Sequence, residues 1–336
     1  MSSRNRNRWI EQTKEKVLFT QRNTDNATKE LLFLYDEAAN EVEKEIGAIF
    51  ARYARDNELT NAEAERLLTG KEYGTWRKSM EEYLKEIPKD AKGSKTLLEL
   101  NTLSAKSRIS RKEALLSGIY QQMINLAHDS NTKLEDLLGD ILRVSYYRGA
   151  YELQRGMGLQ WQVAQINVKT VRDIISYPWS NKHFSSTVWD NVDRLAATAK
   201  REITYGFIKG SSVQDMARQI NSVMDKGRYA AERLVRTECK YFASRGELET
   251  YRAHNIQQYR FIGGSEGQSC DCARWNGEVI ALDAAEPGVN LPPLHPNCLC
   301  TIEAEVNIKM FRDNPDVTPL KDNPKYIEWT RRQGIV

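Results

Sequence analysis

Apolar residues recur at spacings of three and four over most of the chain, which is the spacing of one face of an α-helix. One stripe consists of Leu31, Tyr35, Ala38, Val42, Ile46, Ile49 and Tyr53. Similar stripes occupy residues 97–126, 132–156, 188–206, 211–220 and 228–254. The pattern predicts a mainly α-helical protein whose long amphipathic helices pack their stripes into a common core.

Capping patterns set the expected starts of several helices. Thr60-Asn-Ala-Glu63 and Thr132-Lys-Leu-Glu135 are capping boxes, in which a hydroxyl and a glutamate satisfy the first free amides of a helix. Ser211-Ser-Val-Gln214 has the same form. We therefore expect new helices to begin near residues 60, 132 and 211, and a separate one near Arg228.

The periodicity changes after about Asn255. Residues 299–306 alternate between apolar and polar side chains, which predicts a strand with Cys300, Ile302, Ala304 and Val306 on one face. Asn276-Gly277 predicts a two-residue hairpin between short extended runs. Residues 256–306 are thus expected to form a small α+β, strand-containing module. Three prolines among polar residues indicate an extended tail at 307–336 that is ordered only against a partner surface.

The sequence pattern predicts four segments along the chain. Residues 1–30 form a basic N-terminal arm, residues 31–165 a helical domain, residues 166–306 a second domain that ends in the strand-containing module, and residues 307–336 the tail. A length of 336 residues agrees with two domains of about 150 residues each.

Composition excludes wholesale disorder and a membrane span. Hydrophobic residues make up 40% and charged residues 28% of the chain, which are globular values. No run approaches the roughly 18 apolar residues that a bilayer requires. The polar start shows no signal peptide, so we expect a soluble protein of a cytosol-like compartment.

The charge is nearly balanced overall but uneven along the chain. Lys and Arg number 49 against 46 Asp and Glu, whereas the first 22 residues hold six basic and two acidic residues. Two interpretations stay open for this arm: a solvated terminus, or a segment that contacts DNA phosphates. The candidate contacts are Arg4, Arg6, Arg8, Lys14 and Lys16.

Four of the five cysteines cluster near the C-terminus. Cys270 and Cys272 form one Cys-x-Cys pair, and His295 precedes a second pair, Cys298 and Cys300. Residues two apart on a strand point the same way, so each pair presents two sulfurs on one face. These five residues are more than enough for a tetrahedral structural zinc site.

Two other arrangements of the cluster stay open: a disulfide formed under oxidising conditions, or simply buried thiols. A catalytic Cys–His pair is disfavoured because His295 is the only histidine beside a surplus of thiols. An ADP-ribosyltransferase site built from Arg236, Ser185-Ser-Thr187 and Glu303-Ala-Glu305 is disfavoured because the motifs come in the wrong order. The cluster therefore predicts a structural role, and we expect no enzymatic activity.

A series of short motifs covers roughly residues 189–306. Arg236-Thr237-Glu238 lies in a long predicted helix, Cys272 is followed by Asn276-Gly277-Glu-Val, and Pro293-Leu-His295-Pro-Asn-Cys298-Leu-Cys300 completes the series. In this order the motifs resemble the phage Mu F-like minor head proteins, also called head morphogenesis proteins. Leu299 stands where that family usually has arginine. The family's upstream cysteines are spaced Cys-x2-Cys or are absent, which makes Cys270 the last choice among the ligands.

The resemblance implies that residues 166–306 are a minor-head domain. It implies a structural minor capsid protein of a tailed bacteriophage, present in the host cytoplasm during assembly and then in the virion, inside the capsid near the portal. The portal protein is the implied partner, with scaffold or major capsid protein and genomic DNA as further partners. Some relatives carry a toxin or enzyme, so a toxin-like or nuclease enzyme is one alternative. A DNA-binding module acting through the basic arm is another.

Overall fold

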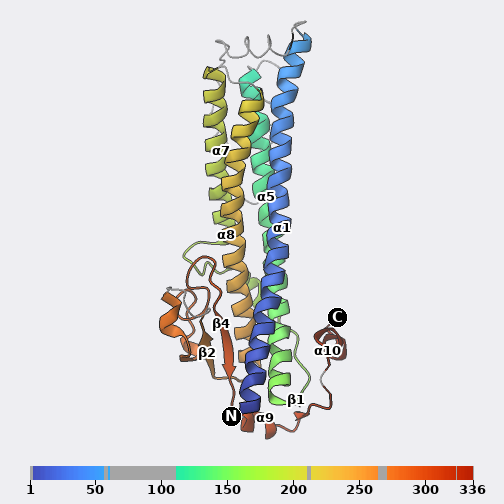
Figure 1. The fold of residues 1–336 in the computed structure, drawn as a ribbon. Coiled ribbons are helices and arrows are strands. Elements are labelled where there is room, and N and C mark those ends of the chain that lie inside the picture. The colour runs from blue at the N-terminus through green and yellow to red at the C-terminus, as the bar shows by residue number, and fades with distance from the viewer. Residues whose placement is uncertain are drawn as a thin grey trace. The chain divides into compact units, whose positions relative to one another are not determined.

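The structure is a computed structural model that describes residues 3–56, 60, 111–209, 213–263, 271–322 and 324–335. These residues form seven α-helices and five short strands (Figure 1), which confirms the predicted mainly α-helical class. The helix predicted to begin near Thr60 falls on residues after 60, which lie outside the described residues. Within the described part of the chain, no helix is both long enough and apolar enough to cross a bilayer.

Two compact units divide the chain, and each is assembled from separate stretches of sequence. Unit 1 contains residues 1–28, 134–183 and 233–336, and unit 2 contains residues 29–133 and 184–232. Three long helices contribute residues to both units: α1 (Ser3–Asp56), α5 (Arg111–Met157) and α8 (Val213–Ala253).

Unit 2 packs segments of α1, α5, α7 (Phe184–Lys209) and α8 around a common core. Leu31, Tyr35, Ala38, Val42 and Ile46 of α1 are all buried, which confirms the predicted stripe over its described length. Gly227 of α8 lies against this stripe: a Cβ there would lie 3.0 Å from the Tyr35 ring and 3.1 Å from Leu195 of α7. Glycine at this position lets three helices approach closely.

Two helices are longer than the sequence predicts. The predicted breaks near residues 132 and 228 are wrong, because α5 and α8 each run without interruption through them. Thr132 lies inside α5, where its hydroxyl donates to the carbonyl of His128, four residues earlier, at 3.1 Å. A threonine hydroxyl in a helix interior can donate to the carbonyl four residues earlier, and here it does so in place of capping a helix start.

In unit 1, a glycine brings α5 and α8 together. A Cβ on Gly246 would collide with the carbonyl oxygen of Leu142 and lie 2.9 Å from the Ser145 Cβ. One turn further on, the Thr250 hydroxyl donates to the Tyr146 carbonyl at 2.6 Å. This contact fixes the C-terminal half of α8 against α5. That half of α8 is the platform on which the residues that follow in the chain pack.

The platform carries a three-stranded antiparallel sheet in the order β3-β2-β4; β2 and β4 are labelled in Figure 1. Its strands are β2 (Gln258–Ile262), β3 (Val279–Ala281) and β4 (Thr301–Glu305). Tyr259 pairs with Ile280 on one side and with Ala304 on the other. Buried and exposed residues alternate along β2, and Cys300, Ile302 and Ala304 are buried at and along β4, as predicted.

The predicted hairpin at Asn276-Gly277 is wrong. The partner of β3 is β2, and these strands are joined by a long connection that contains the 3-10 helix η1 (Asp271–Trp275). Asn276 and Gly277 form the turn between η1 and β3. Gly277 supplies a left-handed backbone (φ 87°), which a tight turn needs at this point whether or not it joins two paired strands.

Short elements complete unit 1. They are β1 (Leu159–Gln160), α6 (Val168–Ser176), the 3-10 helix η2 (Leu282–Ala284), α9 (Ile308–Arg312), β5 (Thr318–Pro319) and α10 (Tyr326–Arg332). Strand β5 pairs with β1, although 157 or more residues separate them in sequence. Asn167 caps α6 by accepting a hydrogen bond from the Lys169 amide at 2.7 Å.

The prediction of an extended tail at 307–336 is wrong for its described residues, 307–322 and 324–335, which contain α9, β5 and α10. The chain itself supplies the ordering surface, because Trp329 of α10 is only 3% exposed and donates to the Gln154 side chain of α5 at 2.8 Å. The Tyr151 hydroxyl holds the preceding segment by donating to the Pro324 carbonyl at 2.9 Å. The Arg148 guanidinium lies 5.1 Å from the centre of the Tyr326 ring, an added cation–π contact.

We expect Trp329→Ala to destabilise unit 1 by about 3–4 kcal/mol, because it removes a buried indole and its hydrogen bond to Gln154. Urea denaturation followed by fluorescence measures this loss. Ile327→Ala is the matched control, since Ile327 lies in the same helix and is 65% exposed. Equal effects of the two substitutions would show that α10 is not docked on α5.

Candidate metal centre

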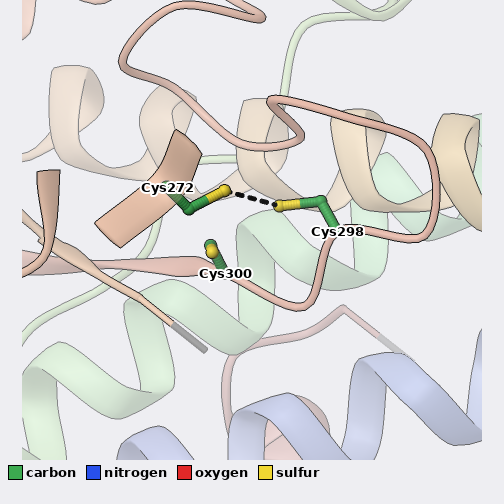
Figure 2. A group of neighbouring side chains, drawn as sticks. All are labelled: Cys272, Cys298 and Cys300. Atoms are coloured by element: carbon green, nitrogen blue, oxygen red, sulfur yellow. Dashed lines mark hydrogen bonds between the residues drawn. The ribbon is translucent and has the colours of Figure 1, made fainter. Parts of the chain in front are cut away.

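Three cysteines of the predicted cluster come together in unit 1. Cys272 lies in η1, Cys298 in the loop that leads to β4, and Cys300 directly before that strand. All three are buried, and their sulfur atoms lie within 4.8 Å of one another. Figure 2 shows the sulfurs of Cys272 and Cys298 pointing toward each other, with that of Cys300 beside them.

The local backbone explains how two cysteines separated by one residue both face inward. Asn297 adopts a left-handed conformation (φ 58°), which asparagine tolerates better than most residues. The amide of Cys298 then donates to the carbonyl of His295 at 3.2 Å and closes a turn. From there the chain is extended, so Leu299 points outward and is 54% exposed while its two neighbours are buried.

The Asn276-Gly277 turn positions the third cysteine. The Asn276 side-chain oxygen accepts a hydrogen bond from the Gly263 amide at 2.8 Å. The Gly277 amide donates to the Phe261 carbonyl at 2.8 Å. These bonds hold η1 against the end of β2, and Cys272 lies on that short helix. The two motif residues therefore act by placing Cys272 near the second cysteine pair.

The sulfur geometry suits a metal ion. The Cys272 and Cys298 sulfurs are 3.7 Å apart, far longer than the roughly 2.05 Å of a disulfide. Zinc–sulfur bonds of about 2.3 Å in a tetrahedral site place two sulfurs about 3.8 Å apart. Hydrogen bonding by the Cys300 thiol lowers the pKa of Cys298 despite the opposing effect of burial, which favours the thiolate form that binds metals. The buried cluster could therefore hold a metal ion.

The other predicted ligands lie apart from this group or outside the described residues. His295 is half-buried, its Nδ1 lies 2.9 Å from the Pro296 carbonyl oxygen, and it is not among the three residues whose ligand atoms converge. Cys270 lies outside the described residues. Cys239, the fifth cysteine, is buried in α8, where loss of hydration raises the pKa of its thiol to about 12.

A buried ion pair lies next to the cysteine-bearing strand. Lys16 of α1 donates to the Glu247 carboxylate of α8 at 2.8 Å and to the Ile302 carbonyl of β4 at 2.5 Å. The side chains of Lys16 and Glu247 are only 9% and 5% exposed. The prediction of Lys16 as a DNA contact is therefore wrong, because its ammonium is held inside unit 1.

The remaining candidate DNA contacts all lie in α1. Lys14 is exposed. The side chains of Arg4, Arg6 and Arg8 lie outside the described part of the structure, so their contact with DNA stays a prediction. Residues 3–30 of the predicted arm are thus the first part of a long helix.

The three residues of the Arg236-Thr237-Glu238 motif point to different neighbours, as their helical spacing predicts. The Arg236 guanidinium pairs with Asp25 of α1 at 3.0 Å. The Thr237 hydroxyl donates to the Arg233 carbonyl within α8 at 2.7 Å. The Glu238 carboxylate accepts a hydrogen bond from the Trp179 indole at 2.9 Å.

Glu238 holds Trp179 between α8 and the cysteine-bearing part of the chain. The indole stacks on Tyr241 with ring centres 4.8 Å apart. On the other side it lies near Gly288, where a Cβ would be 3.8 Å from the ring. Burial raises the pKa of Glu238 to about 7, although the hydrogen bond from Trp179 acts in the opposite direction. The motif thus contributes to packing in unit 1.

Comparison with known proteins places these features in one matched region. Residues 197–303 match the family model described as Phage Mu protein F like protein, which confirms the resemblance drawn from the motifs. The matched region contains Arg236-Thr237-Glu238 and all three clustered cysteines. No curated protein and no solved structure matches the chain.

We expect the stability of unit 1 to fall as the pH rises through the range in which Glu238 ionises. Between pH 4.5 and about 7 the folded chain retains a proton that the unfolded chain has lost, so folding becomes less favourable as pH increases. Glu238→Gln retains an acceptor for Trp179 and cannot ionise. We expect it to match the wild type at pH 4.5 and to exceed it by roughly 2–3 kcal/mol at pH 8.5.

Urea denaturation at both pH values measures this difference. Glu43→Gln, at an exposed position of α1, controls for the loss of one negative charge. A Glu238→Gln variant that is less stable than the wild type at pH 8.5 would contradict the assignment of a buried, protonated carboxyl group.

Proposed function

Because residues 197–303 are a Mu F-like region, we propose that this protein is a structural minor capsid protein that acts in head morphogenesis of a tailed bacteriophage. The observation that carries the proposal is the location of the converging thiols inside that region. Three buried thiols suit a site that stabilises a fold. On this proposal the protein performs no catalysis.

We propose that the cluster binds one structural zinc ion. Cys272, Cys298 and Cys300 would hold it, and Cys270 or His295 would be the fourth ligand. When bound, the ion joins η1 to the loop before β4 and adds its binding free energy to folding. The strands of this sheet are only three to five residues long, so a metal cross-link is a substantial contribution to their stability.

The proposed partner is the portal protein of the same phage, at the portal vertex inside the capsid. Long amphipathic helices suit docking against other helices, since they can present a continuous face. Scaffold or major capsid protein are further proposed partners. Packaged DNA would be contacted non-specifically by Arg4, Arg6, Arg8 and Lys14 at the start of α1.

We expect the purified chain to contain one zinc ion, and Cys298→Ser to lose it and to unfold at lower temperature. Elemental analysis and thermal denaturation measure the two effects. Cys239→Ala is the matched control, because Cys239 is a buried cysteine outside the cluster. Separate Cys270→Ser and His295→Ala variants identify the fourth ligand as the one whose loss lowers zinc affinity. A metal-free protein with a Cys272–Cys298 disulfide would contradict the site.

We expect the tagged chain to co-purify with the portal protein encoded in the same phage genome after co-expression. Size-exclusion chromatography with light scattering gives the stoichiometry of the complex. The arm is tested separately: replacement of Arg4, Arg6 and Arg8 by Gln should leave portal binding unchanged and weaken binding to DNA. Retention of portal binding with no DNA affinity would remove DNA from the proposal, and failure to bind any head protein would overturn the structural role.

A further inference from the structure

The turn at Asn276-Gly277 combines a reactive pair of residues with an exposed location. It is the only Asn-Gly pair in the sequence. In such a pair the glycine nitrogen can attack the side-chain carbonyl carbon of the asparagine, because glycine has no Cβ that hinders the approach. Both residues are exposed, so water reaches the turn. The turn therefore contains the groups that spontaneous deamidation requires.

Two hydrogen bonds occupy the groups that would react. The Asn276 Oδ1 accepts a hydrogen bond from the Gly263 amide at 2.8 Å. The Gly277 nitrogen, which would be the nucleophile, donates to the Phe261 carbonyl at 2.8 Å. The attack needs a nitrogen that has lost its proton and a carboxamide that is free to move onto it. Both hydrogen bonds oppose these changes while they last.

The surrounding backbone holds the turn in this closed arrangement. The Phe261 amide donates to the Glu278 carbonyl at 2.9 Å, so β2 bonds to the turn in both directions. Gly263 lies directly against Asn276: a Cβ on Gly263 would be 3.0 Å from the Asn276 Cβ and 3.1 Å from its Cγ. Reaction therefore has to wait until the turn opens locally and leaves β2.

We propose that Asn276 is a deamidation site whose reaction is controlled by the closure of this turn on β2. In the open turn, the Gly277 nitrogen forms a bond to the Asn276 Cγ. The bond from Cγ to Nδ2 breaks, and ammonia leaves with the amide proton. Water, the only co-reactant, then hydrolyses the cyclic imide. Hydrolysis at Cγ gives aspartate, and hydrolysis at the main-chain carbonyl gives isoaspartate, in which the main chain runs through Cγ.

The two products have different effects on the turn. Aspartate keeps the main chain and a side-chain oxygen that can accept from the Gly263 amide. Isoaspartate adds one carbon to the main chain before Gly277, which displaces the Gly277 amide from the Phe261 carbonyl. Because this bond holds η1 against β2, isoaspartate is expected to loosen the position of Cys272. The modification site depends neither on a bound metal ion nor on a role in the capsid.

The test follows deamidation of the full chain by mass spectrometry, with the folded chain and the chain in urea incubated side by side in a mildly alkaline buffer. We expect the folded chain to react at least about tenfold more slowly, because it reacts only from the locally open turn. Gly263→Ala should react about threefold faster than the wild type or more, since the added Cβ displaces Asn276 and favours opening. Gly47→Ala is the matched control, because a Cβ there meets nothing within 4 Å.

A second measurement tests the effect of the modification on the turn. Ion exchange isolates the deamidated chain, and Asn276→Asp supplies the aspartyl form alone, with the same charge and an unaltered main chain. We expect the deamidated chain, which contains isoaspartate, to unfold at a lower temperature than Asn276→Asp. Equal unfolding temperatures would overturn the proposed effect on the turn.

Three other outcomes decide whether closure controls the reaction. A folded chain that deamidates as fast as the chain in urea overturns the proposal, and so does a folded Gly263→Ala variant that reacts at the wild-type rate. If Gly263→Ala does not fold, the wild type is studied at urea concentrations below its unfolding transition. A deamidation rate that rises with hydrogen exchange in the peptide containing Gly277 supports the proposal, and a rate independent of that exchange overturns it.

Discussion

The buried pair of Lys16 and Glu247 fixes how the cysteine-bearing strand meets the helices. One ammonium is shared between a carboxylate of α8 and a backbone carbonyl of β4. Each buried charge would cost several kcal/mol without the other. The three elements are therefore compatible only in the register that brings these atoms together. Strand β4 pairs with β2, and Cys300 directly precedes β4. The same interaction therefore also fixes the positions of the sheet and of the thiol cluster relative to α8.

In the thiol cluster, cysteines that lie in loops are held in position by the neighbouring sheet and helix. Cys298 depends on a left-handed turn at Asn297, and Cys272 depends on the turn after η1. The turn after η1 is anchored to β2 through backbone hydrogen bonds between Gly277, Glu278 and Phe261. Cys298 and Cys300 pack in the same core cluster as Leu248 and Tyr251 of α8. A rigid helix thus controls the spacing of donors that lie in loops.

Much of the fold follows from periodicity alone. The apolar stripe from Leu31 to Ile46 predicts the buried face of α1, because burial of a regular element repeats at a fixed interval. The alternation at β4 places Cys300, Ile302 and Ala304 correctly, whereas Thr301, which falls between them in the pattern, is buried as well. Helix ends were harder to predict. The Thr132 capping pattern is overridden because α5 runs through it, with buried residues such as Leu126 before it and Leu134 after it, and tertiary packing outweighs a single cap.

The structures of the tail and of Lys16 depend on contacts with residues remote in sequence, which a local sequence pattern does not reveal. The prolines of residues 307–336 suggest an extended segment. Trp329, however, is buried and donates a hydrogen bond to Gln154 of α5, which is remote in sequence. Lys16 resembles a member of a basic arm when only its neighbours are counted. It also continues the buried stripe of α1, however, through Thr24, Ala27 and Leu31. The convergence of Cys272, Cys298 and Cys300, by contrast, was predictable from their spacing in the sequence.

The positions of Lys16 and Ile302 in the sequence have a consequence for biosynthesis. They are 286 residues apart, so α1 must wait for the translation of β4 before its lysine can bind both of its acceptors. Until then, the ammonium of Lys16 and the carboxylate of Glu247, which are buried in the folded chain, are exposed to water. The cysteine-bearing segment emerges from the ribosome only at this late stage, and it meets α1 and α8 already synthesised. Chains that stop before β4 therefore lack the carbonyl acceptor that closes this part of unit 1.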